Sequence, residues 1–443
     1  AYGVAPFTTP SGTIDVMLDR ALVPGAGERL VTLVLCDSRG RLMGELPPFL
    51  ARPLWWPEVD EVVRIVRERH GLEVMVLRLL TAGAGPAGGP VSYLAEVTAG
   101  MPDDTVPLSP EHRAATDSGP RNRRWWADPG GLDGLAGWVD STLSRHGRRR
   151  TGPVRQRKTW NLSLVVSALT TEGEVWFKAV PPFLVDEGGV IARVGRVDPD
   201  LVPVVLGHDA ERRAILMDQI PGADQWGLGG CAGDEEVIAR MVTRWVAVQA
   251  ALVDDIEHAL VLGATDLRPA AMLDDVRDLA GRRSVRDTLT PEEGTMFDSL
   301  VSGLPDRLEA VAACGLPDTL VHGDLHPGNW RRAVTPVERL TLLDWGDVGV
   351  GNPVIDMRAF VERLPDDDLR RRTSRLWAEQ WRRHVPGADP VRAAELLRPV
   401  AELGAALTYQ RFLDHIEATE WIYHEGDPAS RIRAACVVLE EER

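Results

Sequence analysis

Two short polar motifs in the second half of the chain constrain its fold more than any other feature. The first runs from His322 to Asn329 with the sequence HGDLHPGN, and the second begins at Asp344 with the sequence DWG. Each follows a short apolar run typical of a strand, so two strand-end loops can bring Asp324, Asn329 and Asp344 to one point. Magnesium prefers hard oxygen ligands and keeps waters or phosphate oxygens, so two of these side chains suffice to bind it. The remaining carboxylate can orient a hydroxyl proton, as phosphoryl transfer demands.

The two motifs resemble the catalytic loop and the metal-binding turn of aminoglycoside phosphotransferases and choline kinase-like small-molecule kinases, which are relatives of the protein kinases. The resemblance implies that Asp324 is the catalytic base and that Asn329 and Asp344 bind Mg²⁺, with ATP as the phosphoryl donor. It also implies that His322 orients the catalytic loop. Asp356, which ends the segment NPVID, would anchor that loop from the start of a helix.

Lysine is scarce in this chain, and its scarcity helps to select functional positions. All but two of the 50 lysine and arginine residues are arginines, and the two lysines are Lys158 and Lys178. Lys178 lies in an expected strand, and Glu187 follows at the start of a helical segment. In the family that the motifs resemble, a strand lysine binds the α and β phosphates and is held by a helix glutamate. We expect Lys178 and Glu187 to form this pair, with Asp186 and Glu211 as alternatives to Glu187.

The loop expected to cover the phosphates contains no glycine. It reads TWNLS at 159–163, between two expected strands. Either Ser163 or Asn161 contacts phosphate there through its side chain or backbone, or both are ordinary turn residues. No Walker A sequence occurs in the chain, which argues against a P-loop enzyme. At the expected hinge between the lobes, backbone groups of Asp218 and Ile220 are the adenine contacts that the resemblance implies.

The pattern of apolar residues and turn signals divides the chain into four regions. The predicted fold class is α+β, with a bilobal protein kinase-like fold preceded by a small α+β domain. In that small domain, short apolar runs typical of strands alternate with turn signals from Thr13 to Val97. The regions are an accessory domain at 1–118, a linker with a helix at 119–153, a β-rich N-lobe at 154–222, and a helical C-lobe with the catalytic loop and acceptor site at 223–443.

One helix of the accessory domain resembles a degenerate Nudix box. A Nudix hydrolase binds its metals through a cluster of glutamates, and two of these are replaced here, so we expect no hydrolysis even if the topology is shared. An active Nudix hydrolase fused to a kinase is the alternative. The matching residues are Arg64, Glu68, Gly71 and Leu72, and the replacements are Ile65 and Arg69.

Two charged segments allow two interpretations each. A cationic run from Arg145 to Lys158 is either a solvated linker or a rim that attracts phosphate. Near the C-terminus, acidic and aromatic residues form either a solvated helix face or an acidic, aromatic-lined pocket for a cationic or sugar acceptor. These residues are Asp414, Glu417, Glu420, Glu425 and Asp427, with Tyr409, Phe412, Trp421 and Tyr423.

Composition excludes several classes of protein and leaves one leading hypothesis. The net charge of −16 disfavours non-specific binding to nucleic acid or anionic lipid, and no apolar run approaches the ~20 residues of a membrane span. Four widely spaced cysteines argue against disulfides and predict a cytoplasmic setting. We expect an ATP·Mg²⁺-dependent phosphotransferase that acts on a hydroxyl of a small molecule, foremost an aminoglycoside or amino sugar.

The alternatives to this hypothesis are a kinase for another small hydroxylated metabolite and a nucleotide-binding scaffold without turnover. The sequence leaves open the acceptor, the choice between ATP and GTP, the oligomeric state and the role of the accessory domain. It also leaves open the roles of Lys158 and His326.

Overall fold

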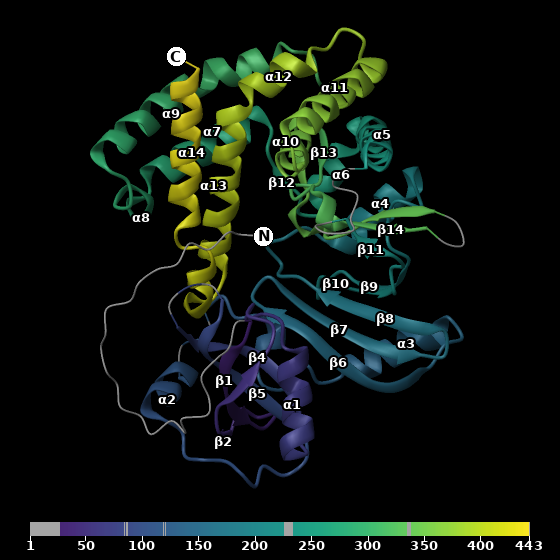
Figure 1. Cartoon of the computed structure of the whole chain (residues 1–443), viewed down its shortest axis with the longest axis vertical. Helices are drawn as coiled ribbons and strands as arrows, with labels where there is room; N and C mark the ends of the chain where they lie inside the picture. The colour runs from purple at the N-terminus through teal and green to yellow at the C-terminus, as the bar shows by residue number, and fades with distance from the viewer. Residues whose placement is uncertain are drawn as a thin grey trace.

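The computed structural model describes residues 27–83, 85, 87–117, 119, 121–225, 234–334 and 338–442. Within these ranges an accessory domain, a β-rich lobe and a helical lobe follow one another along the chain (Figure 1). The accessory domain lies beside the β-rich lobe, and the last two long helices reach toward both from the helical lobe. This arrangement confirms the predicted α+β fold class. The start of the expected accessory domain, including Thr13, lies outside the described residues, as does Cys231.

The accessory domain is a five-stranded sheet with one helix packed on it. The strand order is β2-β1-β5-β4 with β3 paired to β1, and β1 runs parallel to β5. Helix α1 turns its apolar face to the sheet and ends at Gly71, whose φ of 65° is the left-handed conformation that glycine adopts without strain. The elements are β1 Arg29–Cys36, β2 Leu42–Glu45, β3 Phe49–Ala51, α1 Asp60–His70, β4 Glu73–Ala82 and β5 Gly89–Ala99.

The Nudix-like residues of α1 serve the helix itself. Arg64 forms ion pairs with Glu68 at 2.7 Å and with Glu61 at 3.1 Å on the solvent side of the helix. No cluster of three or more histidine, cysteine, aspartate or glutamate side chains suited to a metal occurs within the part of the chain that the structure covers. The expectation that this domain does not hydrolyse anything stays a prediction.

The linker helices cover one face of the β-rich lobe. Trp138 packs edge-on against Phe177 of the sheet, with the ring centroids 5.6 Å apart. This contact joins the linker and the sheet in one hydrophobic cluster. The linker elements are α2 Pro110–Thr116, the 3-10 turn η1 Trp125–Ala127 and α3 Leu135–Arg145.

The β-rich lobe is an antiparallel sheet in the order β6-β7-β8-β10-β9. In β8, Phe177 and Ala179 are buried against the linker, so Trp176 and Lys178 point to the opposite face because side chains alternate along a strand. Helix α4 follows β8 and brings Glu187 to that same face. The elements are β6 Arg150–Trp160, β7 Ser163–Thr170, β8 Gly173–Ala179, α4 Glu187–Val197, β9 Val205–Asp209 and β10 Ala214–Asp218.

The helical lobe contains two small sheets that carry the polar motifs. One sheet has the order β11-β14-β15 and the other β12-β16-β13. Their elements are β11 Ala223–Asp224, β12 Thr265–Asp266, β13 Thr319–Val321, η3 Pro327–Asn329, β14 Trp330–Ala333, β15 Arg339–Leu342, η4 Trp345–Asp347 and β16 Gly349–Gly351.

Helices surround these sheets. No helix among the described residues is long and apolar enough to cross a lipid bilayer. The helical elements are α5 Glu235–Ala251, η2 Val253–Asp255, α6 Ile256–Val261, α7 Pro269–Gly281, α8 Arg283–Arg286, α9 Pro291–Ala312, α10 Val354–Glu362, α11 Asp367–His384, α12 Pro390–Leu396, α13 Arg398–His415, η5 Ala418–Tyr423 and α14 Asp427–Glu441.

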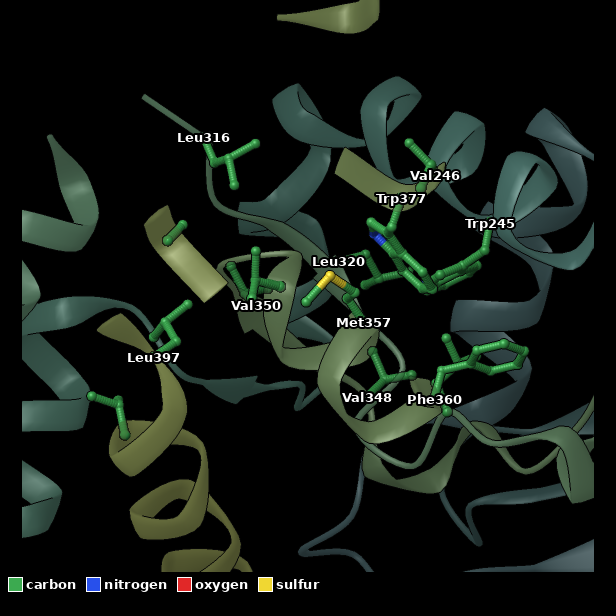
Figure 2. Packing of buried hydrophobic residues seen from close by; sticks show 14 of the residues in the cluster. Trp245, Val246, Leu316, Leu320, Val348, Val350, Met357, Phe360, Trp377 and Leu397 are labelled. Carbon is green, nitrogen blue, oxygen red and sulfur yellow. The ribbon is translucent and has the colours of Figure 1, made fainter. Parts of the chain in front are cut away.

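Large buried side chains pack beneath the strands that carry the polar motifs. Trp245 of α5 and Trp377 of α11 approach each other beside Phe360 and Met357 of α10, as Figure 2 shows. Val350 of β16 lies in the same cluster. Burying a large apolar side chain contributes roughly 1.5–3 kcal/mol. The strands that carry the polar motifs therefore rest on a packed, rigid base.

Candidate functional site

The loop at 322–329 is held from beneath by Asp356. This buried carboxylate accepts hydrogen bonds from the backbone N–H of His322 at 2.8 Å and of Gly323 at 3.1 Å. Trp245 Nε1 and Gln249 Nε2 donate to it as well, at 2.8 and 3.1 Å. Burial raises the pKa of Asp356 to about 6, although these donors favour its charged form. The predicted anchor of the loop is therefore present.

His322 joins this loop to the second motif. Its ring nitrogen Nε2 lies 2.9 Å from the carbonyl oxygen of Leu343, one residue before Asp344. Burial lowers the pKa of His322 to about 4, so the ring is neutral near pH 7. Its environment suits a side chain that orients the loop. Gly323 has a φ of 82°, and a Cβ there would lie 2.1 Å from the backbone oxygen of Asp347, so only glycine fits.

Asp324 faces the cleft and is oriented by two neighbours. Asn329 Nδ2 donates to the backbone oxygen of Asp324 at 2.8 Å and to its Oδ2 at 3.1 Å, and His326 Nε2 lies 3.4 Å from the same Oδ2. Burial opposes the charge of Asp324, but His326 more than offsets it, so the pKa lies below its usual range. His326 Nδ1 also accepts the backbone N–H of Gly328 at 3.0 Å. The sequence assigned His326 no role, and the structure shows that it shapes this loop.

Asn329 and Asp344 lie side by side because the backbone N–H of Leu343 donates to the carbonyl oxygen of Asn329 at 2.8 Å. Asp344 has a φ of 61°, a left-handed conformation that aspartate adopts more readily than most residues. Asn329 donates through Nδ2, which leaves its Oδ1 as a ligand, and Asp344 Oδ2 is likewise not used by its ion pair. These hard oxygen atoms are a donor set that suits Mg²⁺.

Lys178 links the two lobes. Its Nζ donates to Glu187 Oε1 at 2.6 Å and to Asp344 Oδ1 at 2.6 Å. Burial opposes the charge of Lys178, but the two carboxylates raise its pKa above the usual value. The same ammonium holds the pKa of Asp344 below its usual range. The expected pair with Glu187 is therefore present, while Asp186 contacts His208 at 2.7 Å instead.

The expected hinge lines the same cleft. Asp218 ends β10, and its backbone N–H donates to Val204, while its carboxylate contacts Arg148. The backbone N–H of Ile220 has no acceptor among the residues that the structure describes. Both residues line the cavity described below. Within the described ranges the N–H of Ile220 is therefore not used, whereas the N–H of Asp218 is.

The two candidates in the hairpin between β6 and β7 have different surroundings. Ser163 lines the cavity, and its hydroxyl accepts a hydrogen bond from Trp160 Nε1 at 2.8 Å. Asn161 is 2% exposed and faces the C-terminal segment, where its Oδ1 accepts the backbone N–H of Glu417 at 3.2 Å. Its own N–H donates to Glu420 Oε2 at 2.8 Å. Asn161 therefore holds the hairpin in place, and of the two candidates only Ser163 lines the cavity.

Three of the five carboxylates near the C-terminus belong neither to a solvated face nor to an acidic pocket, whereas Glu425 is exposed. Glu417 and Glu420 are buried, and Glu417 binds Arg123 at 2.9 Å. Asp414 binds Arg282 at 2.7 Å. Both interpretations of this segment were wrong for these three carboxylates. Each carboxylate binds a partner that is distant in the sequence, and such partners cannot be identified from the segment alone. The segment contributes only Tyr409, Phe412 and His424 to the cavity, with none of the five acidic residues.

The cationic run is mostly paired within the β-rich lobe and its neighbours. Arg148 contacts Asp218 and Glu172, Arg150 binds Asp140 at 2.9 Å, and Arg157 binds Asp60 and Glu174. Among residues 145–158, Lys158 alone lines the cavity. The run is therefore neither a free linker nor a broad phosphate-attracting rim.

A cavity of about 810 Å³ lies between the lobes, and Lys178, Glu187, Asp324 and Asp344 are among the residues that line it. One side of the cavity includes Lys178, Ser163 and the hinge, and the other side runs into the helical lobe along α7, α9 and α13. Four carboxylates of the helical lobe that line the cavity were not predicted: Asp318, Asp347, Glu362 and Glu402. Burial raises the pKa of Asp347 to about 7, and its Oδ1 has no hydrogen-bond partner in the described part of the chain. In the sequence, the signal that could have identified Asp347 was its position three residues after Asp344.

Comparison with known proteins gives a family and several similar structures. Residues 176–396 match the sequence model of the phosphotransferase enzyme family. A choline kinase from Streptococcus pneumoniae is 14% identical with a TM-score of 0.49, covering 69% of this chain and 99% of that one. A macrolide 2'-phosphotransferase from Brachybacterium faecium is 19% identical with a TM-score of 0.43, covering 69% and 97%.

A putative aminoglycoside phosphotransferase from Ralstonia eutropha is 16% identical with a TM-score of 0.45, covering 70% of this chain and 98% of that one. No curated protein matches the sequence. The family match spans Lys178, Glu187, the loop at 322–329, Asp344 and Asp356, which are the groups that the structure brings together. Through residues 176–396 this chain belongs to the phosphotransferase enzyme family, and it is a small-molecule kinase.

Proposed function

We propose that this protein is an ATP·Mg²⁺-dependent kinase that phosphorylates a hydroxyl of an aminoglycoside or amino sugar. The observation that carries the proposal is the position of Lys178, which binds both Glu187 and Asp344 at 2.6 Å. This contact sets a cation of the β-rich lobe directly above the loop that holds Asp324 and Asn329. Catalysis of phosphoryl transfer consists mostly of such positioning and of charge neutralisation.

In the proposed reaction, Asp324 accepts the proton of the acceptor hydroxyl. Oδ2 is already engaged by Asn329 and His326, so Oδ1 is the atom that would receive the proton. The low pKa of Asp324 keeps the carboxylate ionised and able to orient the hydroxyl at neutral pH. The acceptor oxygen bonds to the γ-phosphorus as the bond to the β,γ-bridging oxygen breaks, and ADP leaves. Asn329 and Asp344 would hold Mg²⁺, which neutralises phosphate charge when bound.

The lining of the cavity supports an acceptor with an amino group. Asp347 Oδ1 is buried without a partner among the described residues, and an ammonium would satisfy it. Asp318 is a second carboxylate in the lining, whereas Glu362 and Glu402 are already paired with Arg358 and Arg431. Much of the remaining lining in the helical lobe is apolar, with Leu267, Met272 and Val400 among its residues. A ring with one apolar face and amino substituents fits this combination.

The test is an acceptor screen that follows ADP production with ATP·Mg²⁺. Panels of aminoglycosides, amino sugars, neutral sugars and small hydroxylated amines would be compared with and without acceptor. We expect turnover with at least one amino-bearing acceptor and phosphate on its hydroxyl by mass spectrometry. Nucleotide binding in a thermal-shift assay without turnover on any panel member would favour the catalytically silent scaffold instead.

A matched pair of variants tests the role of Asp347 in acceptor binding. Asp347→Asn removes the charge that would face the ammonium, whereas Asp254→Asn changes an exposed carboxylate far from the cavity lining. With the acceptor from the screen, KM for the acceptor should rise about tenfold in Asp347→Asn, as expected for loss of a hydrogen bond to a charged group. An unchanged KM would exclude Asp347 as the ammonium site.

A further inference from the structure

The two lysines of this chain lie in one row across the β-rich sheet. Lys158 of β6 is paired with Val165 of β7, and Val165 is paired with Lys178 of β8. Residues paired across strands point to the same face, and neighbouring strands are ~5 Å apart, so the two lysine backbones are about 10 Å apart. All three residues line the cavity. The motifs account for Lys178 but assign nothing to Lys158.

Two tryptophans enclose the ammonium of Lys158. Its Nζ lies 4.3 Å from the ring centroid of Trp55 and 4.6 Å from that of Trp160, and the two rings meet edge-on at 5.4 Å. Both distances are within the range of cation–π attraction. No atom of the described residues accepts a hydrogen bond from Nζ. The aromatic rings therefore hold the charge in place while its three N–H donors stay available to an anion.

Trp55 comes from the accessory domain, which is joined to β6 by backbone hydrogen bonds. The N–H of Val59 donates to Arg157 at 3.0 Å and the N–H of Thr159 donates to Pro57 at 2.9 Å, on either side of Lys158. These bonds extend the sheet beyond its edge strand β6. Arg29 Nη1 holds the carbonyl oxygen of Trp55 at 2.5 Å. This segment thus places Trp55 of the accessory domain in the lining of the cavity.

Lys158 lines the same cavity as Lys178 and Asp344. Among charged groups, Asp344 and Lys178 have the largest electrostatic influence on the pKa of Lys158. Lys178 already donates to two carboxylates, so it can spare at most one N–H for a phosphate. Binding a triphosphate at this point calls for further positive charge, because charge-assisted hydrogen bonds to phosphate are the strong ones.

We propose that Lys158, held in an aromatic cage that the accessory domain completes with Trp55, binds the γ-phosphoryl group of the nucleotide. This inference rests on the proposed function, since it assigns a further residue to the same phosphate site. It gives the accessory domain a part in the reaction without any hydrolysis of its own. Trp55 acts as a positioning residue, because it touches Lys158 and not the phosphate.

Calorimetric titration with two nucleotides tests the proposal. ADP·Mg²⁺ lacks the γ-phosphoryl group, and the β,γ-imido analogue of ATP with Mg²⁺ carries it. In Lys158→Met, affinity for the imido analogue should fall about tenfold or more while affinity for ADP changes less than about twofold. Arg155→Met is the matched control, since Arg155 is an exposed cation on the same strand that does not line the cavity, and both affinities should be unchanged.

Trp55→Ala tests the cage. We expect a weaker, selective loss of affinity for the imido analogue, and Trp55→Phe should restore most of it because an aromatic face returns. A second measurement needs no variant: an amine-reactive sulfonate followed by mass spectrometry should modify Lys158, and the imido analogue should protect it while ADP does not.

The outcomes separate this inference from the proposed function. If the wild-type chain binds both nucleotides and Lys158→Met loses neither or loses both equally, Lys158 does not bind the γ-phosphoryl group, although the kinase assignment stands. Equal protection of Lys158 by the two nucleotides would contradict the inference in the same way. If the wild-type chain binds neither nucleotide, the proposed function fails and this inference fails with it.

Discussion

The two lysines share a sheet face but have opposite surroundings. Lys178 is enclosed by Glu187 and Asp344, which raise its pKa, whereas Lys158 lies between two tryptophans. Burial lowers the pKa of Lys158 to about 8, because the charges of Asp344, Glu58 and Glu420 offset the loss of solvent only in part and Lys178 opposes its charge. One residue type therefore serves as a fixed charge at one position and as a titratable amine at the other.

This contrast predicts how each amine reacts as the pH changes. Only a neutral amine is nucleophilic, so modification of Lys158 by an amine-reactive sulfonate should rise steeply between about pH 7 and 9, centred near 8. Lys178 should stay unmodified over that range because its pKa is raised. Mass spectrometry of peptides would measure both rates in one sample. Modification of Lys178 ahead of Lys158 would show that the two environments are assigned the wrong way round.

At the residue scale, the sequence predicted site residues where a rare residue type occurred at the spacing of a motif. Lys178, Asp324, Asn329 and Asp344 were predicted because their order and spacing are encoded locally. Asn161 was interpreted as a possible phosphate contact, and Glu420 as part of a solvated face or an acidic pocket. Their contact with each other was not predicted, since folding alone brings together segments that are 259 residues apart. Lys158 was noticed as rare but could not be assigned for the same reason, because Trp55 is supplied by another domain.

At the scale of elements, the hairpin between β6 and β7 is fixed to the helical lobe. Asn161 at its tip contacts Glu417 and Glu420 of the segment after α13, and Trp160 packs on Tyr423 with centroids 5.6 Å apart. The strands themselves were predicted from alternating apolar residues, with ends that differ by a few residues. The docking of the hairpin was not predicted, because acidic residues in a polar segment look solvated until their partners are known.

This docking makes stability depend on pH. Burial raises the pKa of Glu420 to about 7 in the folded chain, against a usual value of 4.5. A raised pKa contributes stability that is fully present below about pH 4.5 and is lost as the pH rises through 7. Glu420→Gln, which cannot ionise, should equal the wild type at pH 5 and exceed it by roughly 2–3 kcal/mol at pH 8 in urea unfolding.

The exposed neighbour Glu425 supplies the control for this prediction. Glu425→Gln should follow the wild type at both pH values, since an exposed carboxylate keeps the same environment when the chain unfolds. A Glu420→Gln variant whose stability runs parallel to the wild type from pH 5 to 8 would mean that this carboxyl is not buried in the folded chain.

At the scale of the whole molecule, the accessory domain and the β-rich lobe are joined by specific polar contacts. Gln156 of β6 is 1% exposed, and its amide accepts the N–H of Val76 at 2.8 Å and donates to its carbonyl oxygen at 2.7 Å. The segment Pro57–Val59 pairs with the same strand. The existence of two regions was predictable from pattern changes along the sequence, whereas their shared edge was not, because it depends on backbone groups that every residue has.

Removing the Gln156 amide should loosen this junction. Gln156→Ala leaves a buried N–H and a buried C=O of Val76 without partners, at a cost of roughly 2–5 kcal/mol. Hydrogen exchange should then speed up in β4 and β6 while amides of α5 and α11 in the helical lobe keep their protection. Arg155→Ala, a truncation of an exposed side chain on the same strand, should leave both regions as they are. Uniform acceleration across the chain would indicate global destabilisation instead of a local junction.

The central claim is that Asp324 orients a hydroxyl for transfer of phosphate from ATP. The most direct measurement compares wild type with Asp324→Asn, using the acceptor from the screen, in single-turnover phosphoryl transfer alongside titration of ATP·Mg²⁺ binding. Because general base catalysis contributes about 10²–10⁴-fold, we expect a rate loss of that size with nucleotide affinity nearly unchanged. Transfer by Asp324→Asn at a rate close to wild type would contradict the account.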